Sequence, residues 1–195
     1  MKLCVVDLAN RPPVNRNSTF GHIPVTSDLV STTAVSTNWR GNPRVGEIKS
    51  KRVVIIPDIN LLIYAYDSTS PWHERASKWW ASSLSGSTPV GISWVVALGY
   101  VRLWTNPRVF ASPMPVDAVA AHVESWLNRR IVRIVNPGPR HAELVFSFLR
   151  SLGRGGNLTT DAHLAALAVE SHGVIHTADT DFLRFSGIKW VNPLV

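Results

Sequence analysis

The sequence predicts an α/β fold in which a mainly parallel sheet lies between two layers of helices. Short, continuous aliphatic runs such as VVIIP at 53–57 and VIHT at 174–177 are typical of parallel strands buried on both faces. Between such runs lie longer segments with a helical period, and strands that alternate with helices pair in parallel. The chain of 195 residues is long enough for one domain with a full-sized core.

The first predicted elements run from residue 53 to residue 135. They are a strand at 53–57, helices at 60–67 and 70–84, a strand at 89–93, helices at 94–105 and 115–128, and a strand at 131–135. In the second helix, Ser70 is the expected N-cap, Pro71 takes the first helical position and Glu74 lies in the first turn.

The remaining elements complete the alternation. A helix begins at Pro139 and ends at Gly153, and the loop RGGN follows it. The helix in LTTDAHLAALAVESHG is expected to be capped by Thr159 or Thr160 and closed by Gly173. The strand VIHT comes next, and a last short strand is expected at KWV.

Residues 1–52 differ in composition from residues 53–195. They are rich in Asn, Ser, Thr, Pro and Gly and show no sustained period, so we expect a basic extension that is disordered or loosely attached. They hold 8 Lys and Arg against 3 Asp and Glu, whereas residues 53–195 hold 12 against 10. The domain organisation expected is therefore an extension at 1–52 and one domain at 53–195.

Composition also limits the class of protein. The net charge of +7 and the pI of about 10.2 favour a polyanionic partner, nucleic acid before a membrane surface. Apolar runs stop short of the ~18 residues that a membrane helix needs, and Asp7 interrupts the first of them, so we expect a cytoplasmic protein that does not contact a membrane. The single Cys4 excludes an internal disulfide and a cysteine-based zinc site.

Acidic residues stand where two of the predicted strands end. Asp58 follows the first strand, and Asp179 and Asp181 follow VIHT. Asp161 lies in the first turn of the preceding helix, where the helix dipole favours a carboxylate. Because ligands of open parallel sheets bind at the carboxyl ends of the strands, we expect these side chains to meet at one rim.

Clustered carboxylates raise one another's pKa values unless a cation neutralises them. A site built from oxygen ligands suits Mg²⁺, with Mn²⁺ as a substitute. Such an ion can polarise a phosphoryl oxygen and activate water for attack on phosphorus. Arg102 and Arg108, which we expect near the rim, could contact RNA phosphates.

The ordered segments PDINLLIYAYD, SPWHERASKWW, RLWTNPRVF, TTDAHLAALAVESHG and TADTDFLRF resemble the PIN-domain ribonucleases. Within that family they are most similar to the VapC-type toxins of bacterial toxin–antitoxin pairs, over residues 53–195. The resemblance implies a three-layer α/β/α PIN-like fold and a Mg²⁺-dependent endoribonuclease that leaves a 5′-phosphate and a 3′-hydroxyl. It also implies a homodimer, an RNA substrate and a small antitoxin as partner.

Site roles follow from the same resemblance. It implies that Asp58, Asp161, Asp179 and Asp181 are catalytic, with the first three holding the metal. Asp181 would support Asp179 or hold the following turn. Asn60 is expected to cap the helix after Asp58 or to orient its carboxylate.

One position departs from the family pattern and keeps an alternative open. The family usually has a Glu on the helix after the second strand, and counting from Ser93 that position is Gly99. The alternative is a catalytically weak or inactive PIN module that binds RNA or an antitoxin without cleavage. A phosphatase of the haloacid-dehalogenase type fits less well, because Asn60 stands where its second Asp is needed and the only Lys after Lys78 is Lys189.

Overall fold

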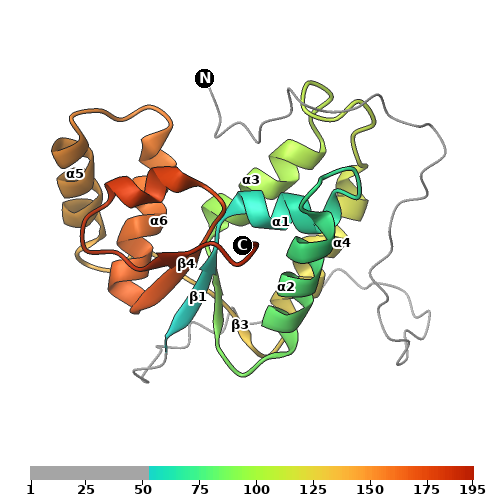
Figure 1. Cartoon of the computed structure of the whole chain (residues 1–195), viewed down its shortest axis with the longest axis horizontal. Coiled ribbons are helices and arrows are strands. Elements are labelled where there is room, and N and C mark those ends of the chain that lie inside the picture. The colour runs from blue at the N-terminus through green and yellow to red at the C-terminus, as the bar shows by residue number, and fades with distance from the viewer. Residues whose placement is uncertain (1–52) are drawn as a thin grey trace, which may run out of the picture.

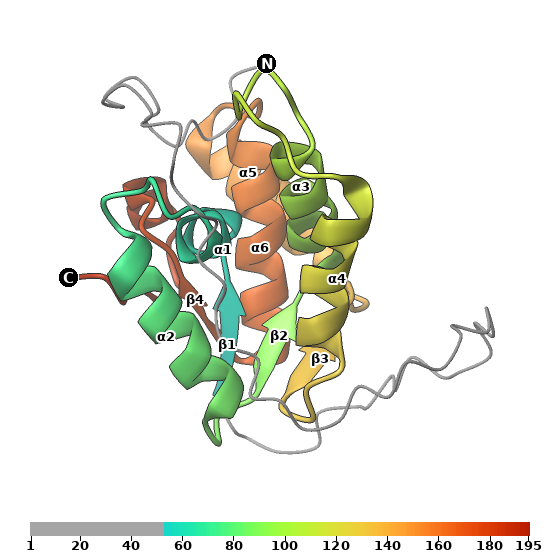
Figure 2. The same cartoon turned by 90° about the vertical axis from the view of Figure 1, so that its right-hand side faces the viewer.

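A computed structural model describes residues 53–195, and the expected extension at 1–52 lies outside these residues (Figures 1 and 2). The five strands form one sheet in the order β3-β2-β1-β4-β5, and every pair of neighbours is parallel. The strands are β1 (Val54–Pro57), β2 (Val90–Ile92), β3 (Val132–Ile134), β4 (Gly173–His176) and β5 (Trp190–Val191). The predicted parallel sheet is confirmed, with β1 at its centre.

Helices cover both faces of this sheet. Figure 1 shows α5 and α6 on one side and α1, α2 and α4 on the other. The helices are α1 (Ile59–Tyr66), α2 (His73–Ser85), α3 (Trp94–Trp104), α4 (Val116–Leu127), α5 (His141–Leu152) and α6 (Leu158–Ser171), and a short 3₁₀ helix spans Thr180–Arg184. The three-layer α/β/α arrangement is the one expected from the alternation of strands and helices.

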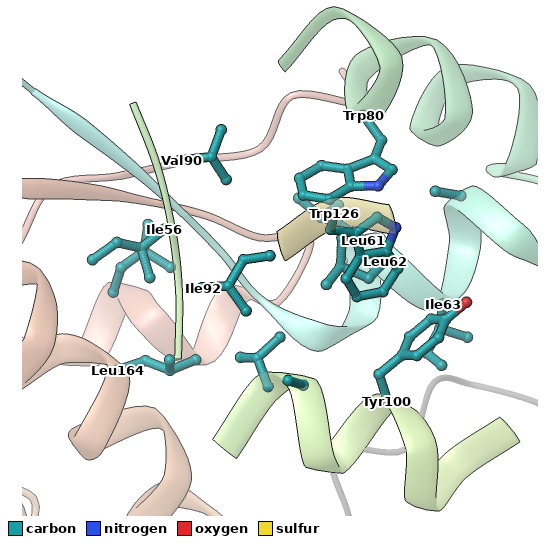
Figure 3. Packing of buried hydrophobic residues seen from close by; sticks show 14 of the residues in the cluster. Ile56, Leu61, Leu62, Ile63, Trp80, Val90, Ile92, Tyr100, Trp126 and Leu164 are labelled. Carbon is teal, nitrogen blue, oxygen red and sulfur yellow. The ribbon is translucent and has the colours of Figure 1, made fainter. Parts of the chain in front are cut away.

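The core is aliphatic around the sheet and aromatic between the helices on one face (Figure 3). Ile56 of β1 and Ile92 of β2 are fully buried, in keeping with strands covered on both faces. On the α2–α4 side, the rings of Trp80 and Trp126 meet edge to face at 5.6 Å. Three tryptophans of the described residues, Trp80, Trp104 and Trp126, are buried in this core.

The expected start of α2 is wrong by two residues. Ser70 is not its N-cap, because α2 begins at His73 after a turn that includes Pro71. In this turn the side chain of Asp67 accepts hydrogen bonds from both the backbone and the hydroxyl of Thr69. These local bonds satisfy the backbone outside a helix and delay the helix start.

The expected caps of α6 are also wrong. Thr159 and Thr160 lie within the first turn, and Asn157 precedes the helix without a side-chain cap in the described chain. At the other end, the left-handed residue is His172, with φ of 54°, and Gly173 already belongs to β4. Gly173 serves packing instead: a Cβ there would lie 2.7 Å from Cδ1 of Ile56.

Within residues 53–195, none of the helices combines the length and the apolar composition that a membrane crossing requires.

Candidate metal centre at the carboxyl edge of the sheet

Asp58 leaves the sheet at the end of β1 and caps α1. Its Oδ1 accepts a hydrogen bond of 2.7 Å from the backbone N–H of Ile59, and its backbone has the extended conformation usual for an N-cap. The side chain is only 5% exposed although it is a carboxylate. The proline and the aliphatic run before it therefore bring a charge to the buried edge of the sheet.

Two polar side chains orient this carboxylate. Oδ2 of Asp58 accepts from the hydroxyl of Thr177 at 2.7 Å and from Nδ2 of Asn60 at 3.0 Å. Nδ2 of Asn60 also donates to Oγ1 of Thr177 at 3.0 Å, so the three side chains form a closed network. Asn60 thus orients Asp58, as expected, while the cap of α1 is Asp58 itself.

Asp179 and Asp181 lie in the turn after β4. The backbone N–H of Asp179 donates to Oγ1 of Thr177 at 2.9 Å, and Oδ1 of Asp179 accepts from the backbone N–H of Asp181 at 2.8 Å. Asp181 is half exposed and pairs with Arg184 at 3.3 Å. Asp179 therefore belongs to the network around Thr177, whereas Asp181 serves the turn.

Asp161 reaches the same edge from the first turn of α6. It is 4% exposed, and its Oδ2 is buried without a hydrogen-bond partner among residues 53–195. Burial, and after it the nearby charges of Asp58, Asp179 and Asp181 in that order, together raise the pKa of Asp161 to about 7. The three other acids are therefore close enough to act on it electrostatically.

The pKa of Asp58 is also raised, to about 6. Burial is the largest cause, the hydrogen bonds from Thr177 and Ile59 oppose it, and the charge of Asp179 adds to it. The charges of Asp58, Asp179 and Asp181 all act on Asp161, so the four acids that the sequence singled out lie near one another although they come from three separate segments of chain.

This arrangement fits a hard divalent cation in its chemistry. The donors are carboxylate oxygens, their charges repel, and one buried oxygen has no partner, all of which a cation would relieve. As the side chains stand, residues 53–195 contain no group of three His, Cys, Asp or Glu side chains already close enough to bind an ion.

Gly99 lies in α3, where the family pattern has a Glu. A Cβ at this position would lie 2.7 Å from Cδ1 of Ile59, the residue next to Asp58. An aliphatic side chain therefore occupies the space that an acid on α3 would use. The site is left with the acids of β1, α6 and the turn after β4.

The two arginines expected near the rim lie at the end of α3 that is far from the sheet edge. Arg102 is exposed in the last turn of α3, and Arg108 is exposed just beyond that helix. Since α3 starts at the sheet edge after Ser93, Arg102 lies about 13 Å along the helix from it. Their predicted RNA contacts stay a prediction.

Thr177 is the residue of this site that the sequence reasoning missed. The signal was present, because a Thr at the last position of the predicted strand VIHT, shortly before an acidic turn, can bond both the turn and a neighbouring strand end. What the sequence alone does not show is that β1 is that neighbour.

Comparison with known proteins gives consistent results. The model of the family described as PIN domain matches residues 55–188. Ribonuclease VapC33 of Mycobacterium tuberculosis is 42% identical over 141 residues, which are 72% of this chain and 99% of the relative. Ribonuclease VapC37 of the same organism is 43% identical over 138 residues, which are 71% of this chain and 96% of the relative.

Solved structures share the fold at low identity. VapBC2 from Rickettsia felis, bound to a DNA fragment from its promoter, matches with a TM-score of 0.54 and 12% identity, over 72% of this chain and 98% of that one. VapBC-1 from nontypeable Haemophilus influenzae matches with a TM-score of 0.53 and 16% identity, over the same shares.

Proposed function

Because this chain belongs to the PIN-domain family, and within it to the VapC-type ribonucleases, we propose that it is a Mg²⁺-dependent endoribonuclease and the toxin of a type II toxin–antitoxin pair. The observation that carries the metal dependence is the pair formed by Asp58 and Asp161. Both carboxylates are buried, the charge of Asp58 raises the pKa of Asp161, and Oδ2 of Asp161 has no partner among the described residues. A positively charged ligand would offset both the burial and the repulsion of these two carboxylates.

Asp58 and Asp161 would hold the ion together with Asp179. The ion would supply positive charge that stabilises the charge developing on the phosphoryl oxygens. Thr177 and Asn60 hold the carboxylate of Asp58 in one orientation through its Oδ2. Asp181 keeps the turn that presents Asp179, since its backbone N–H donates to the side chain of Asp179.

Replacement of single acids tests this function. Asp58→Asn and Asp161→Asn keep the size of each side chain and remove its charge, so cleavage of RNA in Mg²⁺ should fall by roughly 100-fold or more. Asp117→Asn is the matched control, because Asp117 also lies in the first turn of a helix but is exposed on α4. Cleavage by Asp58→Asn at the wild-type rate, or wild-type cleavage that persists in EDTA, would show that the mechanism is wrong.

A second candidate is a module that binds RNA or an antitoxin without cleaving. The observation that favours it is the contact between Gly99 and Ile59, which leaves α3 without an acid at the site. This candidate predicts RNA binding that survives EDTA and no cleavage products at any concentration of Mg²⁺ or Mn²⁺. Products that appear only with the metal would exclude it.

The partners proposed are RNA, a small antitoxin and a second copy of the chain. Both solved structures described above are VapBC assemblies, which supports an antitoxin partner. For the dimer, the support is the outer face of α3, where Trp94, Val95 and Leu98 expose 47%, 36% and 61% of their surface. Leu98→Glu should convert a dimer to a monomer in light scattering, and an unchanged mass would remove this face from consideration.

A further inference from the structure

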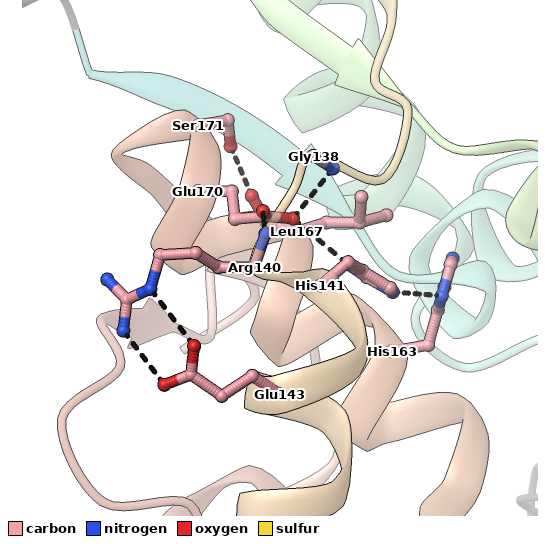
Figure 4. A network of polar contacts seen from close by, with 8 residues as sticks. All are labelled: Gly138, Arg140, His141, Glu143, His163, Leu167, Glu170 and Ser171. Carbon is pink, nitrogen blue, oxygen red and sulfur yellow. Dashed lines mark hydrogen bonds and ion pairs between the residues drawn. The ribbon is translucent and has the colours of Figure 1, made fainter.

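A polar cluster outside the acidic site joins α5 to α6 (Figure 4). Oε2 of Glu170 accepts from the backbone N–H of Gly138 at 2.9 Å and from Nδ1 of His141 at 3.1 Å, and Oε1 accepts from the N–H of Arg140 at 3.1 Å. Nε2 of His141 lies 2.9 Å from Nδ1 of His163. We refer to these five residues as the Glu170 network.

The geometry of the Glu170 network is specific. The side chains of His141 and Glu170 are only 12% and 14% exposed, and three donors converge on one carboxylate. A Cβ on Gly138 would lie 2.6 Å from Oε1 of Glu170, so the carboxylate needs a glycine at that corner. The neighbouring pair of Arg140 and Glu143 is different, since its side chains are 64% and 68% exposed.

The first turns of α6 need support from outside the helix. Asn157 provides no side-chain cap in the described chain, and the loop before the helix contains two glycines with positive φ, Gly153 at 64° and Gly156 at 63°. Local sequence therefore does little to fix the place where α6 begins. Asp161 lies in this part of the helix, and His163 follows it by two residues.

We propose that Glu170 and His141 are positioning residues for Asp161, because Glu170 fastens the last turn of α6 to the corner between β3 and α5 and orients His141, which contacts α6 at His163 next to the turn of Asp161. Glu170 bonds the corner through Gly138 and Arg140, and the contact between His141 and His163 passes this restraint to the turn. The inference rests on the proposed role of Asp161 in holding a cation, and it adds how that carboxylate is kept in place.

The first test uses the full-length protein without metal. Glu170→Ala removes the acceptor of three bonds, and Glu143→Ala is the matched control on the exposed pair beside it. In Glu170→Ala, hydrogen exchange at the amides of residues 162–165, which bond the first-turn carbonyls, should rise by roughly threefold to tenfold over Glu143→Ala. The carboxylate of Glu170 can only accept, so it favours the tautomer of His141 that carries its proton on Nδ1. The ¹⁵N spectrum of Glu170→Ala should show that this preference is lost.

The second test measures Mn²⁺ affinity, by electron paramagnetic resonance, in the same proteins. Glu170→Ala should bind Mn²⁺ roughly threefold to tenfold more weakly than wild type, and Glu170→Gln, which keeps an acceptor oxygen, should recover part of the loss. A folded Glu170→Ala protein with wild-type exchange at 162–165 and wild-type Mn²⁺ affinity would overturn the inference.

Asp161→Asn separates this inference from the proposed function. If wild type and Asp161→Asn bind Mn²⁺ equally, the metal role of Asp161 is wrong, while the exchange result still decides whether the Glu170 network holds the turn. If Glu170→Ala does not fold, Gly138→Ala takes its place, because the added methyl displaces the carboxylate and leaves every polar side chain present. Unchanged exchange in that variant counts against the inference equally.

Discussion

Thr177 connects the two strand ends that form the acidic edge. Its hydroxyl donates to Asp58 and accepts from Asn60 and from the backbone N–H of Asp179. The sequence does not show that Thr177 contacts Asp58, since β1 and β4 are adjacent only in the fold. The residue matters because it satisfies three buried polar groups with one oxygen.

Thr177→Val should therefore be costly although it conserves size. The loss leaves the Asp179 N–H and one bond of Asn60 unsatisfied, so the free energy of unfolding should fall by about 1–3 kcal/mol. Urea denaturation of Thr177→Val and Thr177→Ser measures it, and Ser, which keeps the hydroxyl, should lose less. Equal stability of the two variants would contradict the role given to the hydroxyl.

The buried acids also predict how stability depends on pH. The folded-state pKa values of Asp58 and Asp161, about 6 and about 7, lie above the ordinary value of 3.8. The folded protein binds more protons than the unfolded chain, so their contribution is present in full below pH 4 and is lost as pH rises through 6 and 7. Without metal, wild type should lose on the order of 1–3 kcal/mol relative to Asp161→Asn between pH 5 and 8.

Comparison with Asp161→Asn is needed because His176 acts in the opposite direction. Burial lowers the pKa of His176 to about 4, so its contribution is lost as pH falls from 6.5 through 4. This contribution is common to both proteins and cancels in the difference. Urea titrations in EDTA at several pH values give the free energy of unfolding of both proteins. If the two curves of free energy against pH are parallel, the pKa of Asp161 is not raised in the folded protein.

At the scale of elements, the strands and helices were predictable and their ends were less so. The aliphatic runs at β1, β2 and β4 and the apolar period of α3 and α4 correspond to the observed elements. The starts of α2 and α6 were wrong, because the Asp67 turn delays the first and the second has no side-chain cap in the described chain. Capping rules assume that a polar side chain near the predicted start bonds the first turn of the helix, and at these two starts none does.

The packing of α1 against α3 gives a prediction for the Gly99 position. Ala in a helix is about 1 kcal/mol better than Gly, but here its Cβ meets Cδ1 of Ile59, and such overpacking costs about 1–3 kcal/mol. Gly99→Ala should therefore destabilise wild type and stabilise Ile59→Val, which lacks Cδ1. A double-mutant cycle measured by urea denaturation should show coupling of about 1 kcal/mol. Additive effects would mean that the two side chains do not compete for space.

At the scale of the whole molecule, the sequence located the acids on one rim because parallel strands end at the same edge. It predicted that Asn60 orients Asp58, but it could not show the same role for Thr177, which is separated from Asp58 by 119 residues. The Glu170 network was out of reach for the same reason, with Gly138 and Glu170 separated by 32 residues.

The distribution of charge gives a prediction for the full chain. Residues 1–52 carry 8 of the 20 Lys and Arg but only 3 of the 13 Asp and Glu. If the extension contacts RNA phosphates, removing it should lower the slope of log binding constant against log salt concentration, by about 0.7 for each lost contact with single-stranded RNA. Filter binding at several salt concentrations measures the slope, and an unchanged slope would exclude the extension from RNA binding.

The central place of β1 has a consequence for synthesis. This strand leaves the ribosome early, yet its neighbour β4 is encoded near the end of the message. A nascent chain therefore carries Asp58 for most of translation without Asp161 or Thr177 beside it. The acidic edge can assemble only after nearly every codon has been read, and a product of translation that stops before α6 lacks it.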